Sequence, residues 1–226
     1  MISSFTKTIA TALLCCLCCP LLFSQNGIEW QPELSLTWQA SSRWEFNVKT
    51  LSYHTRAAAA ASTAHLEGAL TGAYRLLDGS ALSLGYAFRL REPFDAVRST
   101  ENRLTWQYVG IQRKGKYRTG HRLRAEQRFR PAGLIHRWRY RLSLDFPLDG
   151  ERLDPGELYA KGAGELLWSI QSGELPEGES RLSGGLGIYL SPGATFELIA
   201  EYRLSDSNLA APAHRLIIFS TCYLNL

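Results

Sequence analysis

The chain has 226 residues, enough for one domain, and carries a formal net charge of +4 at pH 7. Its basic residues are spread among acidic ones and form no polybasic tail, so we expect no nucleic-acid partner. Aromatic residues make up 11% of the chain, and they recur in the alternating segments described below.

The first 25 residues are predicted to be a cleaved signal peptide. One lysine precedes an apolar run over residues 9–23, and the small residue Ser24 follows it. This layout is typical of a secretory signal, and the run is short for a membrane-spanning helix. We expect cleavage near Ser24 or Gln25, which leaves a single mature domain over residues 26–226.

Cysteine usage is consistent with this prediction. Four of the five cysteines lie inside the signal peptide, so Cys222 alone remains after cleavage. The mature chain therefore forms no internal disulfide and depends on its secondary structure for stability. After the signal we find neither an amphipathic helix nor an apolar run long enough to span a membrane as a helix.

Instead, the chain reads as eleven segments in which apolar and polar residues alternate, which is the pattern of β-strands. The approximate spans are 33–40, 43–53, 63–75, 81–91, 101–112, 116–130, 135–146, 157–168, 181–190, 194–204 and 213–226. Successive side chains of a strand point to opposite faces. Sorted this way, the charged residues gather on one face and Leu, Trp, Tyr and Phe on the other.

The densest charge pattern lies between His121 and Phe146, where arginine recurs at every second position in two adjacent segments. We expect these arginines to form a charge network with acids of neighbouring strands, because a guanidinium fits a carboxylate through two hydrogen bonds. The predicted network comprises Glu101, Arg103, Gln107, Arg122, Arg124, Glu126, Arg128, Arg137, Arg139, Arg141, Asp145, Glu165, Arg181 and Glu197.

These patterns predict an all-β fold, an antiparallel, up-and-down, closed transmembrane β-barrel of 10 to 12 strands with a wet, charged interior. A soluble barrel or sandwich has the same alternation turned inside out. Three features favour the membrane barrel: the signal peptide, the Trp and Tyr residues on the apolar face, and the last segment. That segment ends the chain with apolar residues at Leu216, Ile218, Leu224 and Leu226, similar to the carboxy-terminal signal of bacterial outer-membrane barrels.

Topology adds a constraint, because bacterial single-chain barrels have an even number of strands. Either the first two segments merge, giving ten strands, or residues 27–31 supply a twelfth. If the last strand ends in the periplasm, tight turns at Asp78-Gly79, Lys114-Gly115 and Pro192-Gly193 fall on the periplasmic side. The longer gaps at 54–62, 92–100, 170–180 and 205–212 then fall on the outer side.

Several stretches carry a family resemblance: ENRLTWQ, HRLRAEQRF, RWRYRLSLDFPL, Glu165 and LSGGLGIYL…FELIAEYRL. Over nearly the whole mature chain, the sequence resembles a family of uncharacterised exported bacterial proteins of unknown function with a predicted outer-membrane-barrel fold. The resemblance implies location in the outer membrane of a Gram-negative bacterium and supplies no activity.

The function follows only in outline. Bases outnumber acids on the charged face, so the barrel is expected to be either structural, closed by its own ion pairs, or a passive channel that favours anions of unknown identity. Its partners would be outer-membrane lipid and the barrel-assembly machinery that inserts it.

Two other functions stay open. One is a soluble periplasmic barrel that binds a small molecule or lipid. The other is a lipid-modifying enzyme at the barrel rim, where His54 and His65 lie near Ser52, Ser62 and Thr63. No HExxH, nucleophile-elbow, phosphate-loop or metal-ligand spacing occurs, so we predict no catalytic residue, cofactor or metal site.

Overall fold

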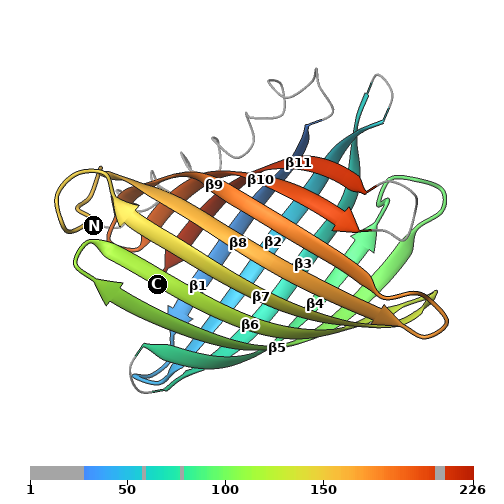
Figure 1. Ribbon diagram of the computed structural model, residues 1–226, viewed down its shortest axis with the longest axis horizontal. Helices are drawn as coiled ribbons and strands as arrows, with labels where there is room; N and C mark the ends of the chain where they lie inside the picture. Colours follow the sequence, from blue (N-terminus) through green and yellow to red (C-terminus); the bar gives the residue numbers. More distant parts are fainter. Residues whose placement is uncertain (1–27, 58–59, 77–78, 207–211) are drawn as a thin grey trace.

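The computed structural model describes residues 28–57, 60–76, 79–206 and 212–226, which form one closed β-barrel (Figure 1). Its strands are β1 (Glu29–Gln39), β2 (Trp44–Ala57), β3 (Ala60–Arg75), β4 (Ser80–Arg91), β5 (Ser99–Lys114), β6 (Tyr117–Arg130), β7 (Gly133–Pro147), β8 (Leu158–Gln171), β9 (Glu177–Ser191), β10 (Ala194–Asp206) and β11 (Ala213–Asn225). Each strand pairs with its neighbours in the sequence, and β1 closes the barrel against β11. The predicted all-β, up-and-down closed barrel is confirmed. The predicted signal peptide, residues 1–25, lies outside the described residues and stays a prediction.

A search of the described residues for a helix long and apolar enough to cross a membrane found none.

The barrel has eleven strands, which lies within the predicted range of 10 to 12, but the expectation of an even number is wrong. The first two segments stay separate strands, and residues 29–31 extend β1 instead of forming a twelfth. With an odd number of alternating strands, the first and last run in the same direction. The closing pair is therefore parallel, with Glu29 beside Ile217 and Thr37 beside Asn225, while every other pair is antiparallel.

The barrel has two distinct ends. The turn end carries the β1–β2, β3–β4, β5–β6, β7–β8 and β9–β10 connections and the end of β11, and the loop end carries the remaining connections. Gly79, Gly115 and Gly193 all lie at the turn end and have positive φ. At Gly193, φ is 102° and an added Cβ would stand 2.7 Å from the Asn225 carbonyl oxygen, so only glycine fits there. The three tight turns thus share one end, as expected, although Asp78 lies outside the described residues.

One predicted gap is largely strand. Residues 54–62 were expected to form a loop, yet β2 continues to Ala57 and β3 begins at Ala60. Their small and polar side chains hide the alternation, but the backbones stay paired, with Thr55 beside Ser62, after a bulge between Tyr53 and His54. In Figure 1 this hairpin extends past its neighbours at the loop end.

The two faces of the sheet differ as the alternation requires. Along β7, Trp138, Tyr140, Leu142 and Leu144 are exposed on the outside. The alternate residues of the strand, from Arg139 to Asp145, turn into the barrel, where Asp145 is only 9% exposed. The interior of this barrel is therefore polar, and its apolar residues form the outer surface.

Candidate functional site

The interior of the barrel is the candidate site, and strand register decides which charges meet there. On β5, β7 and β8 the inward positions are odd-numbered, whereas on β6 they are even-numbered. Because the β5–β6 turn, Gly115-Lys116, has two residues, each odd-numbered position on β5 pairs with an even-numbered position on β6. Gln107 therefore lies beside Arg124, and Arg103 lies beside Arg128. All fourteen residues of the predicted charge network face the interior.

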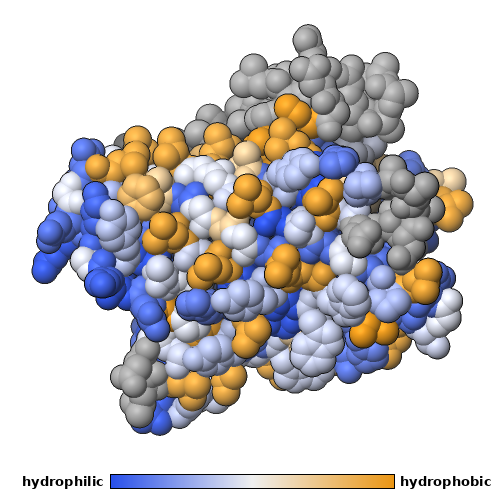
Figure 2. Space-filling view, viewed as in Figure 1, coloured by the Kyte–Doolittle hydropathy of each residue, from blue (hydrophilic) through white to orange (hydrophobic). Residues whose placement is uncertain are grey.

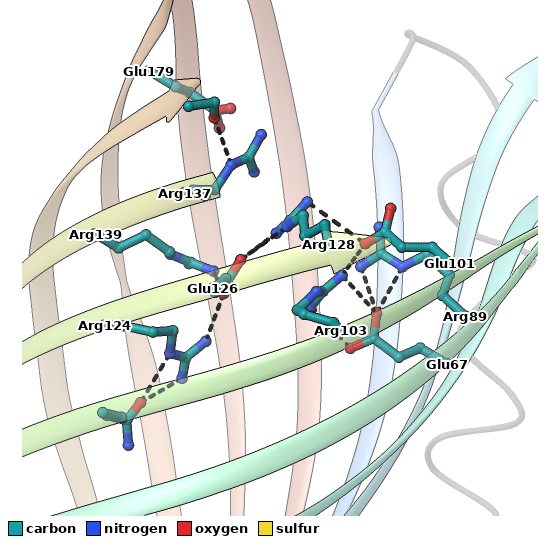
Figure 3. A network of polar contacts seen from close by, with 12 residues as sticks. Glu67, Arg89, Glu101, Arg103, Arg124, Glu126, Arg128, Arg137, Arg139 and Glu179 are labelled. Atoms are coloured by element: carbon teal, nitrogen blue, oxygen red, sulfur yellow. Dashed lines mark hydrogen bonds and ion pairs between the residues drawn. The ribbon is translucent and has the colours of Figure 1, made fainter. Parts of the chain in front are cut away.

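The first group of ion pairs lies toward the loop end on β3 to β6 (Figure 3). The Glu101 carboxylate is fully buried and accepts hydrogen bonds from Arg103 Nη2 at 2.8 Å and Arg130 Nε at 2.5 Å. The Glu67 carboxylate accepts from Arg89 Nε at 2.6 Å and lies 3.3 Å from Arg103 Nη2. Arg103 thus joins two carboxylates that stand on different strands.

The second group lies at mid-barrel on β6 to β9. Glu126, 2% exposed, accepts from Arg128 Nη2 at 2.6 Å and from Arg139 Nη1 at 3.1 Å. Arg139 also donates through Nη2 to Glu165 at 2.8 Å, and Arg122 Nη2 donates to the same carboxylate at 2.9 Å. Each carboxylate is therefore shared by several guanidinium groups, which is how an acid-poor interior can hold so many arginines.

The remaining pairs line the other walls. Toward the turn end, Lys161 Nζ lies 2.7 Å from Glu197 Oε1, and Arg118 Nη1 lies 2.7 Å from Asp145 Oδ2. Toward the loop end, Arg181 pairs with Glu179 and Arg203 with Glu201. Arg137 points toward Glu179 in Figure 3 and donates through Nε to Ser169 Oγ at 2.7 Å.

The interior is not filled completely. A cavity of about 990 Å³ runs inside the barrel and is lined by residues of all eleven strands. Its basic lining residues are Lys49, Arg89, Arg91, Arg103, Arg118, Arg122, Arg124, Arg128, Arg130, Arg137, Arg139, Arg141, Lys161, Arg181, Arg203 and Arg215. Its acidic ones are Glu29, Glu33, Glu67, Glu92, Asp145, Glu165, Glu179, Glu197 and Glu201. Bases exceed acids even when the buried Glu101 and Glu126 are added, so the cavity is net cationic.

Sequence reasoning missed several partners in this network. Glu179 lies before the predicted start of its strand, and Arg118 and Arg130 were not assigned to a face. Tyr159 donates through its hydroxyl to Glu197 at 2.6 Å, and Tyr223 does so at 3.3 Å. A tyrosine among apolar residues gives no sign in the sequence that it faces a polar interior.

The outer surface is the opposite of the interior. Large apolar side chains are exposed on every strand from β2 to β11, among them Leu84, Trp138 and Leu182 at 55, 60 and 69%. Figure 2 shows these hydrophobic residues scattered along the strands of the visible face. Trp138 and Trp168 are direct cross-strand neighbours within this surface. Exposed large apolar side chains therefore recur around the outer surface.

A second cluster lies at the loop-end rim, where the β2–β3 hairpin leaves the barrel. Ser52 Oγ and His54 Nε2 are 2.9 Å apart, and Thr63 Oγ1 and His54 Nδ1 are 3.2 Å apart. The Trp30 ring stacks on the imidazole at 5.2 Å. His65 is not part of this cluster, because it faces the cavity and stacks on Tyr53.

These features define the class of the protein: a closed β-barrel with an apolar outer face and an ion-paired, net cationic interior. The chain belongs to the family described as "Protein of unknown function (DUF2490)", whose model matches residues 30–209. A comparison with curated proteins found no significant relative. Across the described residues, no three His, Cys, Asp or Glu side chains group in a way that could hold a metal ion.

Proposed function

We propose that the protein is an integral outer-membrane β-barrel of a Gram-negative bacterium whose interior forms a narrow, anion-favouring passage. The observation that carries this proposal is the separation of the two faces, with Leu182 69% exposed outside and Glu101 fully buried inside. A soluble barrel places its apolar residues inward. The reverse arrangement suits a barrel surrounded by lipid.

Strand length and composition support this placement. The strands have 11 to 16 residues, and about 9–11 residues suffice to cross a bilayer when tilted. Leaving a large apolar side chain in water rather than an apolar phase costs ~1.5–3 kcal/mol, so a lipid environment would stabilise the outer face of strands β2 to β11. Insertion would require the barrel-assembly machinery, with the turn end in the periplasm and the loop end outside.

The charge balance supports the anion preference. Arginine and lysine exceed acidic residues along the cavity, and a cationic wall in restricted water raises the local concentration of anions. The ion pairs stabilise the walls and narrow the path. We therefore expect a small conductance, unlike that of a wide porin.

Planar-bilayer recording of the refolded protein under a KCl gradient tests this proposal. We expect discrete small openings and a reversal potential of the sign that chloride permeation gives. A cation-selective reversal potential, or bilayers that stay silent although the protein has inserted, would contradict the passage.

A second candidate function rests on the Ser52, His54 and Thr63 geometry at the rim. In the tautomer with the proton on Nδ1, His54 would donate to Thr63 Oγ1, and its Nε2 would accept the Ser52 proton. Ser52 Oγ would attack the carbonyl carbon of a lipid ester, and His54 would pass the proton to the departing alcohol. Water would then release the fatty acid from the serine.

Fatty-acid release from phospholipid micelles tests this candidate. Ser52→Ala and His54→Ala should abolish it, whereas Ser62→Ala, which removes a nearby hydroxyl paired with Thr55, should not. Wild-type protein without activity, or equal losses in all three variants, would exclude a rim hydrolase.

A further inference from the structure

A row of small side chains crosses the cavity wall on four neighbouring strands. Gly120 pairs with Ser143, Ser143 with Ala163, and Ala163 with Ser183. Long side chains flank this row on both sides, so the row forms a recess in the wall at Gly120 and Ser143, whereas Ala163 and Ser183 are each only 8% exposed. Gly120 and Ser143 line the cavity directly.

Cationic residues outnumber acidic ones on both flanks, where Glu165 and Asp145 are the acids. Arg122 and Arg141 face each other across β6 and β7 on one side. Arg118 and Lys161 lie on the other side, each next to Asp145 in the strand register. The two flanking rungs are four residues apart along each strand, or about 13 Å. Arginine and lysine side chains bending inward from both rungs can reach a small ion between them.

Donors at this recess are left over from the ion pairs. The one hydrogen bond of the Arg141 guanidinium within the described part of the chain goes to Ser183 Oγ at 3.4 Å. In the same part of the chain, the buried Nε atoms of Arg118 and Arg122 have no acceptor, and the buried Asp145 Oδ1 beside them has no donor. A charged donor that is buried without an acceptor is costly, so this arrangement favours an added anionic acceptor.

The charge excess is also local. Arg122 faces Arg141, and Arg124 faces Arg139, on nearby rungs of the same two strands. Like charges directly opposite each other are destabilising. Glu165 already accepts from Arg122 and Arg139, and Arg141 is left without a carboxylate of its own. An anion with two negative charges would relieve this repulsion.

We propose that the recess is a binding site for a tetrahedral oxyanion of the phosphate type. Arg141 and the unpaired Nε of Arg122 supply donors from one side, and the Ser143 hydroxyl lies on the floor. The unpaired Nε of Arg118 supplies a donor from the other side, where Lys161 is already paired with Glu197. A guanidinium binds phosphate oxygens through two parallel hydrogen bonds. This inference deepens the anion-favouring passage proposed above and rests on its cationic interior, but it requires only the closed barrel.

Titration calorimetry of the refolded barrel in detergent with inorganic phosphate tests the site. Wild-type protein should bind phosphate, and Arg141→Gln should weaken binding about tenfold or more, because it removes a charge-assisted donor pair. Arg215→Gln is the matched control, since Arg215 lines the same cavity on β11 near the loop end. It removes the same charge away from the recess and should change affinity by less than about twofold.

A second variant, checked for folding, distinguishes loss of the binding site from loss of the folded barrel. Ser143→Leu fills the recess from its floor without changing charge and should also abolish binding, with heat-modifiable gel migration reporting that the barrel is intact. Lack of phosphate binding to wild-type protein, or equal weakening by Arg141→Gln and Arg215→Gln, would overturn the site. Displacement of phosphate by glycerol phosphate would support the site and identify phosphomonoesters as ligands. Displacement by sulfate alone would support it for free inorganic ions.

The site and the passage can fail separately. Phosphate binding without conductance would support the site and contradict the passage. Conductance without phosphate binding would contradict the site alone.

Discussion

Neutralising Glu126 tests whether the interior ion pairs stabilise the barrel. Its carboxylate is 2% exposed and lies 2.6 Å from Arg128 Nη2, 3.1 Å from Arg139 Nη1 and 3.5 Å from Arg124 Nη1. The change Glu126→Gln keeps the shape of the side chain but removes the charge that these three guanidinium groups share. Breaking a buried pair from one side costs ~3–5 kcal/mol because the partner charges stay buried.

We expect Glu126→Gln to lower the free energy of unfolding by about 3 kcal/mol, at the lower end of that range, because Arg139 keeps Glu165 and Arg128 keeps Glu101 as partners. The assay is urea unfolding of the refolded barrel in lipid vesicles, followed by tryptophan fluorescence and checked by gel migration. The Glu126 pairs are shielded from solvent, so added salt should change this loss little.

The matched control is Glu45→Gln, because the Glu45 pair with Arg75 is much more exposed, at 31% and 45% of the side chains. Exposed pairs contribute ~0–1 kcal/mol, so this variant should be near wild type. If the two variants lose equal stability, or Glu126→Gln loses none, the reasoning about the buried network is refuted.

Three further predictions concern the outer face, the wall and the passage. Leu182→Arg should destabilise the barrel in vesicles by up to ~2–4 kcal/mol. Leu175 lies in a loop and is nearly as exposed, at 68%, so Leu175→Arg should leave the stability unchanged. Equal unfolding free energies of the two variants would argue against lipid contact. Gly187→Ala should lower the urea midpoint of unfolding by the equivalent of ~1–3 kcal/mol, because an added Cβ would fall 2.1 Å from Tyr159 Cζ. An unchanged midpoint would show that the Tyr159 ring can move aside. Arg124→Gln, which removes a cationic lining residue held by Gln107, should shift the bilayer reversal potential toward zero; an unchanged potential would count against control of selectivity by the mid-barrel arginines.

Much of the fold was predictable because alternation is strong wherever one strand face is wholly apolar. The segments 81–91 and 135–146 fall within β4 and β7 to within two residues at each end. The prediction failed where side chains are small or mixed, as in the paired hairpin around Thr55 and Ser62. The eleven predicted segments match the eleven strands, and only the expectation of an even count was wrong. That expectation came from how bacterial barrels close, whereas here β1 and β11 pair in parallel, which no local pattern encodes.

The sequence predicted which charged residues face the interior, but it did not predict which of them pair with one another. Periodicity indicates that Arg139 and Glu165 share a face, yet only the register of β7 against β8 brings them together. The same limit applies to the recess, since Gly120, Ser143 and Ala163 stand far apart in the sequence and become neighbours only across three strands. Contacts across a sheet depend on turn lengths and bulges as much as on residue type.

Cell fractionation determines whether the apolar exterior lies in the outer membrane, as we propose. Membranes of cells that express the full chain would be separated on a density gradient and washed with alkaline carbonate. We expect the protein to stay in the outer-membrane fraction and to be released only by detergent. Recovery in the soluble periplasmic fraction without detergent would contradict it.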